Sequence, residues 1–109
     1  MFAISNSVAS YVTSAARSNS PENLTVLMQI PYRALLPRRL EMSNLLVPVA
    51  VSSSHVGFCA IRLEPTWMVI GQSAGVAASM AAAQRIPVHD VPSAELKARL
   101  RALGQVLEL

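Results

Sequence analysis

The chain has a single cysteine, Cys59, among its 109 residues. One thiol excludes an internal disulfide and is too few for a cysteine-ligated iron–sulfur cluster. A reducing, cytoplasmic compartment is therefore expected. Because the sequence shows no partner thiol or base for it, Cys59 is expected to be a small buried side chain without a redox role.

Glycine is scarce as well, and the positions of the four glycines matter more than their number. They are Gly57, Gly71, Gly75 and Gly104. The turn that cradles the pyrophosphate of a dinucleotide needs the pattern G-x-G-x-x-G between a strand and a helix. These four positions cannot form that pattern, so the chain has no dinucleotide-binding fingerprint of its own.

Charged residues make up only 14% of the chain and aromatic residues 5%, whereas hydrophobic residues make up 52%. This is more apolar than one small domain needs, which indicates surface that something else covers. The net charge of +3 comes from scattered Lys and Arg. Because basic and aromatic residues are not interleaved, nucleic acid is not an expected partner.

The first part of the chain differs in composition from the rest. Residues 1–23 are rich in Ser and Asn and predict a poorly ordered leader or a weak helix. Their opening lacks the basic and apolar segments of a secretory signal, so export is not expected. Residues 24–109 are expected to form the folded part.

Two apolar runs in the folded part predict strands. The first covers residues 25–30 and stops at a proline. The second, residues 44–51, is apolar enough to be buried on both faces of a mostly parallel sheet, although Pro48 indicates an edge position or a bulge. Between them, the proline-bounded residues 31–37 predict an extended connector or a further strand.

Residues 62–84 form the most informative stretch, a charged entry into twenty uncharged residues. Pro65 suits the first turn of a helix, so a helix is predicted to begin between Glu64 and Thr66. Its first N–H groups are a natural seat for an anionic or electron-rich group, and Arg62 adds to that field. The alternative is that Arg62 and Glu64 pair with each other or with neighbours, as exposed charges usually do.

Small residues recur every fourth position along this helix, at Gly71, Gly75, Ser79 and Ala83. They form a ridge where another backbone can approach closely, and the helix is expected to lie tightly on a sheet. A membrane span is the rival interpretation, since the length and the G-x-x-x-G pattern fit it. It is not favoured, because the side chains are mostly Ala, Gly and Ser and aromatic belts are lacking.

His55 lies in the serine-rich stretch 52–61, which is expected to be a loop between the second apolar run and the helix. The order strand, polar loop and helix is typical of α/β ligand sites. His55 is therefore a candidate site residue, with a hydrogen-bonded structural role as the alternative.

A final helix is predicted after Ser93, a favourable N-cap. Its apolar stripe consists of four leucines at helical spacing, Leu96, Leu100, Leu103 and Leu107, with basic residues off the stripe. One face of this helix is expected to pack against the rest of the protein and the other to be exposed to solvent.

Taken in order, these motifs resemble the C-terminal part of the FAD-dependent oxidoreductase family, which includes heterodisulfide-reductase-subunit-A-like and xanthan-lyase-associated flavoproteins. The resemblance covers about residues 24–107. The stretches that match are I-P-Y-R-A-L-L-P at 30–37, N-L-L-V-P-V at 44–49, S-H-V at 54–56, I-R-L-E-P at 61–65, G-Q-S-A-G at 71–75, V-H-D-V-P at 88–92 and L-R-A-L-G-Q-V-L at 100–107.

The resemblance implies an α/β fold, as a fragment of a Rossmann-like FAD-binding domain with its last strands, a flavin-facing helix and a C-terminal helix. It implies FAD as the cofactor. Backbone N–H groups at the helix start would face the pyrimidine edge of the flavin and favour its reduced, anionic form. The implied cofactor-binding residues are Arg62, Leu63, Glu64, Pro65, Thr66 and His55.

The missing glycine pattern sets the functional expectation. The chain is expected to be a C-terminal fragment of an FAD-dependent oxidoreductase that is not active alone, with a partner chain supplying the dinucleotide-binding half. The alternatives are a non-enzymatic interaction module that docks on a partner chain and a small membrane protein. Catalytic residues and substrate are not assigned.

Overall fold

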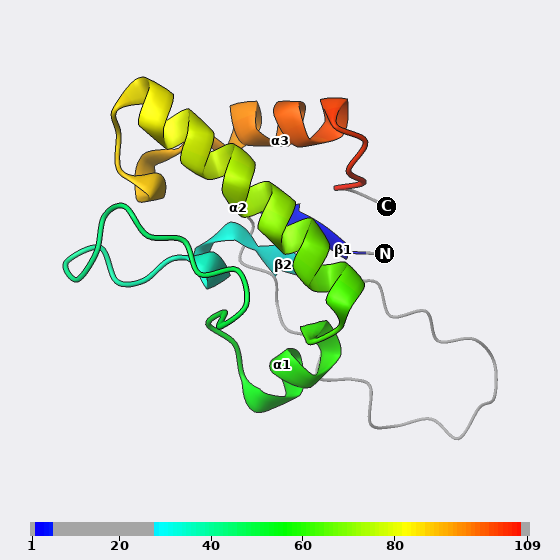
Figure 1. Cartoon of the computed structure of the whole chain (residues 1–109). Coiled ribbons are helices and arrows are strands. Elements are labelled where there is room, and N and C mark those ends of the chain that lie inside the picture. Colours follow the sequence, from blue (N-terminus) through cyan, green and yellow to red (C-terminus); the bar gives the residue numbers. More distant parts are fainter. Residues whose placement is uncertain (1, 6–27, 108–109) are drawn as a thin grey trace, which may run out of the picture.

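The computed structural model describes residues 2–5 and 28–107, which form two short strands, three α-helices and two 3-10 turns (Figure 1). Four residues of the expected leader are thus a strand, and the rest of residues 1–23 lies outside the described part. In chain order the elements are β1 (Phe2–Ser5), β2 (Met28–Pro31), η1 (Tyr32–Leu35), α1 (His55–Ile61), α2 (Glu64–Gln84), η2 (Val88–Asp90) and α3 (Ser93–Ala102).

The strands β1 and β2 pair in parallel, with Ile4 opposite Ile30. They form a sheet of only two strands among the described residues. β2 contains part of the run predicted as a strand at residues 25–30, whereas residues 25–27 lie outside the described part. The rest of the described chain is helix and loop, so the expected α/β character is confined to this small sheet.

The strand predicted over residues 44–51 is not formed. These residues belong to a long irregular connection between η1 and α1 on one side of α2 (Figure 1). The connection is tied down at two points, where the N–H of Val47 donates to the carbonyl of Leu35 and the N–H of Ser52 to that of Ala34, both at 2.8 Å. A run of strand-forming residues becomes a strand only when another strand pairs with it, and no described strand does so here.

Two further predictions between β2 and α2 are wrong. Within residues 31–37, predicted as an extended connector or a further strand, Pro31 ends β2 and Tyr32–Leu35 form the 3-10 turn η1. Residues 55–61 are the helix α1 rather than a loop. α1 begins there because the hydroxyl of Ser54 accepts a hydrogen bond from the N–H of Gly57 at 3.1 Å and caps the helix. Cys59 lies on α1 and is exposed, not buried.

The helix α2 confirms the prediction from Pro65 and from the long uncharged run. It starts at Glu64, has Pro65 in its first turn and ends at Gln84. At the end, Arg85 adopts a left-handed conformation with φ of 53° and donates its N–H to the carbonyls of Ala81 and Ala82. α2 is the element on which the rest of the described chain packs.

Two hydrophobic clusters lie along α2. The N-half cluster joins the first half of α2 to β2, η1 and α1, through Ile30, Ala34, Leu35, Val51, Ile61, Ile70 and Ala74. The C-half cluster joins the second half of α2 to η2, α3 and the tail, through Tyr32, Ala77, Met80, Ala81, Val88, Val91, Leu96, Leu100 and Leu107.

The ridge of small residues on α2 does not pack as predicted. A Cβ placed on Gly71 or Gly75 would meet no atom within 4 Å. The buried face of α2 is a different one, formed by Ile70, Ser73, Ala74, Ala77, Met80 and Ala81. No helix of the described residues is both long and apolar enough to cross a membrane.

The helix α3 uses Pro92 as its N-cap and ends at Ala102, so Ser93 is its first residue. Leu96, Leu100 and Leu107 are buried, as predicted, but Leu103 is exposed. The stripe is interrupted because Gly104, with φ of 85°, turns the chain back towards α2.

The tail is fixed to α2 through Gln105. Its Nε2 donates to the carbonyl of Val69 and to Oε1 of Gln72, at 3.2 and 2.7 Å, and its Oε1 accepts from the hydroxyl of Ser73 at 3.1 Å. The tail therefore belongs to the packed part of the molecule.

Candidate functional site

The first turn of α2 is the site that the sequence singles out. Arg62 and Leu63 alone connect α1 to α2, and the N–H of Arg62 still donates to the carbonyl of Phe58, at 3.0 Å. The N–H of Trp67 is the first to bond within α2, to the carbonyl of Leu63 at 3.1 Å. The N–H groups of Glu64 and Thr66 precede it and have no acceptor inside the helix, while Pro65 has no N–H to offer.

The charged side chains at this turn are exposed and unpaired within the described part of the chain. Arg62 and Glu64 have no hydrogen bond or ion pair there, so the alternative that they pair with each other is not observed. The guanidinium of Arg62 adds to the positive end of the helix dipole, and the carboxylate of Glu64 opposes it. The turn thus offers backbone donors and one free cation to a ligand.

Two polar atoms beside this turn are buried without a hydrogen-bond partner, Oγ1 of Thr66 and Nε1 of Trp67. Thr66 is fully buried, at 0% exposure, and Trp67 packs on the N-half cluster. The sequence analysis named Thr66 but missed Trp67. The available signal was that Trp67 is the only tryptophan and immediately follows the predicted helix start.

His55 is separated from these residues. It is the first residue of the seven-residue α1, whereas Arg62 directly follows the last one, so the helix puts them roughly 10 Å apart along its axis. The His55 side chain is exposed and has no hydrogen bond among the described residues. The structure therefore brings residues 62–66 together but does not place His55 with them.

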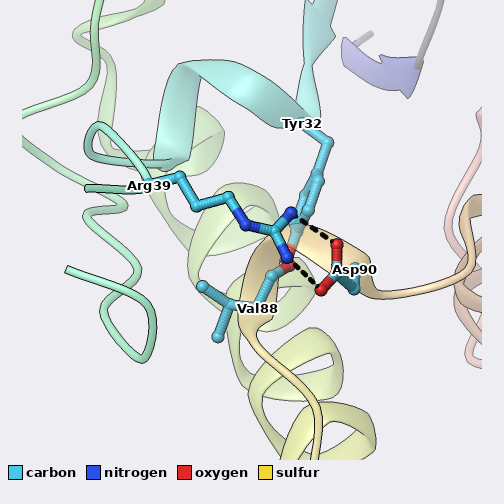
Figure 2. Close-up of polar contacts among 4 residues, drawn as sticks. All are labelled: Tyr32, Arg39, Val88 and Asp90. Atoms are coloured by element: carbon cyan, nitrogen blue, oxygen red, sulfur yellow. Dashed lines mark hydrogen bonds and ion pairs between the residues drawn. The ribbon is translucent and has the colours of Figure 1, made fainter. Parts of the chain in front are cut away.

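A second polar cluster joins η2 to the chain around η1, and the sequence analysis did not predict it (Figure 2). Arg39 and Asp90 form a two-point ion pair, with N–O distances of 2.7 and 2.5 Å. The buried hydroxyl of Tyr32 donates to the carbonyl of Val88 at 2.8 Å. Nε2 of His89 lies 2.9 Å from the carbonyl oxygen of Pro37. Their sequence separation of more than 50 residues explains why no local pattern indicated the contacts.

The environment of this cluster shifts the pKa values of three groups, two upwards and one downwards. Burial raises the pKa of Tyr32 to about 12, so its hydroxyl keeps its proton and remains a donor. The hydrogen bonds from Arg39 lower the pKa of Asp90, and the same carboxylate raises the pKa of Arg39. The cluster is therefore a clamp that holds η2, and Tyr32, Arg39 and Asp90 stay in the protonation states that their bonds need.

Two shallow grooves lie elsewhere on the described surface. One, of about 440 Å³, runs between α2 and α3 and is lined by Gly75, Val76, Ser79, Arg99, Ala102 and Leu103. The other, of about 350 Å³, lies between η1 and the connection that follows it. Neither of these two grooves is lined by residues 62–66. Residues 62–65 are exposed, whereas Thr66 is buried.

Residues 13–100 match the sequence profile of the family described as FAD dependent oxidoreductase. This chain belongs to that family. No match is found among curated proteins or among solved structures. The family is one that binds FAD, and the donor chemistry at the start of α2 fits part of such a cofactor: unbonded N–H groups and the unpaired Arg62 suit an electron-rich, anionic group.

Proposed function

We propose that this member of the FAD-dependent oxidoreductase family supplies the flavin-facing part of a Rossmann-like domain and is not active alone. The observation that supports the proposal is the first turn of α2, where backbone N–H groups without an acceptor inside the helix follow the exposed Arg62, whose side chain has no partner among the described residues. The dinucleotide-binding pattern is absent from the four glycines, so the phosphate end of FAD needs another polypeptide segment.

FAD supplies electron and hydride transfer when it is bound. The contribution of this chain is electrostatic: the dipole of the 21-residue α2 and the guanidinium of Arg62 favour negative charge in front of the first turn. Leu63, Glu64, Pro65 and Thr66 shape that turn. His55 would contact the cofactor only from the far end of α1.

The finer assignments follow the motif order. We further propose that the chain belongs to the heterodisulfide-reductase-subunit-A-like and xanthan-lyase-associated group, which its motif order resembles, and that it works in a reducing, cytoplasmic compartment, which its lone cysteine suits. No described group of His, Cys, Asp or Glu side chains could hold a metal ion.

Trp67 allows a direct test, because it is the only tryptophan. FAD is titrated into the chain alone and into the chain co-expressed with the dinucleotide-binding half of a complete family member, while tryptophan emission is recorded. We expect quenching of Trp67 in the complex only. Tight stoichiometric binding by the chain alone would contradict the fragment hypothesis.

The role of Arg62 is tested by Arg62→Gln in that complex. Removing the cation should make the reduction potential of the bound flavin more negative, because negative charge at the turn loses stabilisation. Arg85→Gln is the matched control, since Arg85 lies at the opposite end of α2, roughly 31 Å away. Equal potentials in the two variants would show that Arg62 does not act on the flavin.

A second function is favoured by one observation, the amount of exposed apolar surface around α1. In this alternative the chain is a non-enzymatic interaction module, and a stable complex with a partner forms without any flavin. Size-exclusion chromatography with light scattering, performed with and without FAD, separates the two functions.

A further inference from the structure

The helix α2 has two fully buried hydroxyl groups, and they differ in their hydrogen bonds. Thr66 and Ser73 are both 0% exposed and both lie on the buried face of the helix. The hydroxyl of Ser73 lies 2.9 Å from the carbonyl oxygen of Val69 and 3.1 Å from Oε1 of Gln105. Oγ1 of Thr66 has no hydrogen-bond partner within the described part of the chain.

The way in which α2 begins explains this difference. Inside a helix, a serine or threonine hydroxyl bonds to the carbonyl four residues earlier, as Ser73 does with Val69. Four residues before Thr66 is Arg62, which lies between α1 and α2 with ψ of 26° and is followed by the extended Leu63 with ψ of 142°. The carbonyl of Arg62 is therefore outside the helix and does not take the place that Val69 takes for Ser73.

The unpaired hydroxyl is unfavourable for the chain alone. Burial removes its hydrogen bonds to water, and no protein group among the described residues replaces them. Valine has the shape of threonine without the hydroxyl and would avoid this cost. Buried polar groups of native proteins are almost always paired, so an unpaired one indicates a partner that is added later.

The position of Thr66 shows on which side such a partner would bind. Thr66 belongs to the first turn of α2, and helical side chains lean towards the N-terminus of their helix. Its hydroxyl therefore lies on the side of the free N–H groups. Residues 62–65 are exposed, and the side chains of Arg62 and Glu64 have no partner in the described part, so these residues can move aside without breaking a side-chain bond.

We infer that the hydroxyl of Thr66 donates a hydrogen bond to a carbonyl oxygen on the pyrimidine edge of the bound flavin. The inference rests on the proposed function and adds a side-chain donor to the backbone N–H groups and Arg62. A flavin carbonyl becomes a stronger acceptor when reduction adds negative charge to the ring. Thr66 therefore favours the reduced cofactor, as Arg62 does, but from a buried position.

Urea denaturation of the chain alone is the first test. Thr66→Val removes an unpaired hydroxyl, so the urea midpoint should stay the same or rise. Ser73→Ala is the matched control, because it removes a buried hydroxyl that has partners and should lower the midpoint. A lower midpoint for Thr66→Val would overturn the inference, since the hydroxyl would then already be bonded in the chain alone, for instance to a buried water.

The second test measures the affinity and the reduction potential of FAD in the complex with the dinucleotide-binding half of a complete family member. Thr66→Val should weaken the binding of reduced FAD by about tenfold more than that of oxidised FAD, and the potential should become more negative. Thr66→Ser keeps the hydroxyl and should keep the potential. Ser73→Ala should not change it, because Ser73 lies roughly 10 Å further along α2.

Salt separates the contribution of Thr66 from that of Arg62. The shift in potential caused by Arg62→Gln should shrink at high salt because Arg62 is exposed, whereas the shift caused by Thr66→Val should persist. An unchanged potential in Thr66→Val, or equal shifts in Thr66→Val and Ser73→Ala, would overturn the inference. If Arg62→Gln still shifts the potential in that case, the proposed function stands. A complex that does not bind FAD would refute both.

Discussion

The two halves of α2 differ in how completely their surroundings are built. Around the C-terminal half, the C-half cluster has nine buried residues, three from α2 itself and six from η1, η2, the residue after η2, α3 and the tail, and the hydroxyl of Tyr32 bonds to the carbonyl of Val88. Around the N-terminal half, the cluster is smaller, with seven residues, and α1 buries only Ile61. Two of the three buried polar side-chain atoms without a partner among the described residues lie here, and the third is Nδ1 of His89 in η2. The C-terminal half of α2 is thus the more completely packed end of the helix, called here the finished end, and the N-terminal half is the unfinished end.

The difference shows where stability and function reside. The C-terminal half has the larger of the two clusters and is expected to fold from the residues in this chain. The unfinished end contains the first turn of α2, which is the proposed cofactor site, and the exposed apolar surface around α1. Sites that complete themselves only on binding are expected to be the less stable part of a protein.

The largest expected effect comes from removing a buried side chain from the C-half cluster. Leu100 is fully buried in the C-half cluster, so Leu100→Ala should lower the free energy of unfolding by about 2–5 kcal/mol. Met68→Ala, at a 75% exposed position on the other half of α2, should change it by less than about 0.5 kcal/mol. Urea denaturation measures both. Equal losses would show that the two halves are packed alike.

The next largest effect is expected from a substitution that removes one hydrogen bond of the clamp around η2. Tyr32→Phe leaves the buried carbonyl of Val88 without its donor and should cost about 1–3 kcal/mol. Burial raises the pKa of Tyr32 from 10.0 to about 12, so its contribution is complete below pH 10 and is lost as the pH rises through 12. The difference in unfolding free energy between the two proteins should therefore shrink over that interval. A constant difference would contradict this.

A smaller effect, an increase in stability, is expected from a substitution on the exposed ridge of small residues along α2. Gly75→Ala should stabilise the chain alone by about 0.5–1 kcal/mol, because the added methyl group meets no atom and alanine is the better helix former. Thermal unfolding followed by circular dichroism measures the change. A loss of stability would mean that another surface approaches Gly75 closely in solution.

The smallest effect concerns the exposed ion pair. Asp90→Asn should lower the thermal midpoint slightly at neutral pH, since exposed pairs contribute little. Because Arg39 lowers the pKa of Asp90, the contribution is present above about pH 4 and is lost as the pH falls through the lowered pKa. The midpoints of the two proteins should converge in acid. A difference that persists there would show that the pair is not its cause.

The parts of the fold that the sequence predicted correctly depend on local physics. Pro65 indicated the start of α2, and the spacing of Leu96 and Leu100 indicated the buried face of α3. The strand over residues 44–51 could not be judged from its own residues, because pairing depends on a strand elsewhere. The helix α1 was missed although its signal, the capping hydroxyl of Ser54, was present in the sequence.

The candidate site, too, could be predicted only where it depends on local sequence. The cluster of residues 62–66 followed from the helix start, which is a local property. The position of His55 depended on whether the residues after it were loop or helix, and the helix moved it away. The prediction that the glycine ridge is packed depended on which face of α2 is covered by segments distant in the sequence. These segments cover a different face.

The tail after α3 has a consequence for proteolysis. Leu107 is buried in the C-half cluster although only four residues separate it from the end of α3, and Gln105 holds the intervening chain on α2. A protease that cuts between Ala102 and Gln105 would therefore remove a core side chain and not a dispensable extension. The tail should be resistant while the protein is folded, and the first cut there should be followed by rapid degradation of the rest.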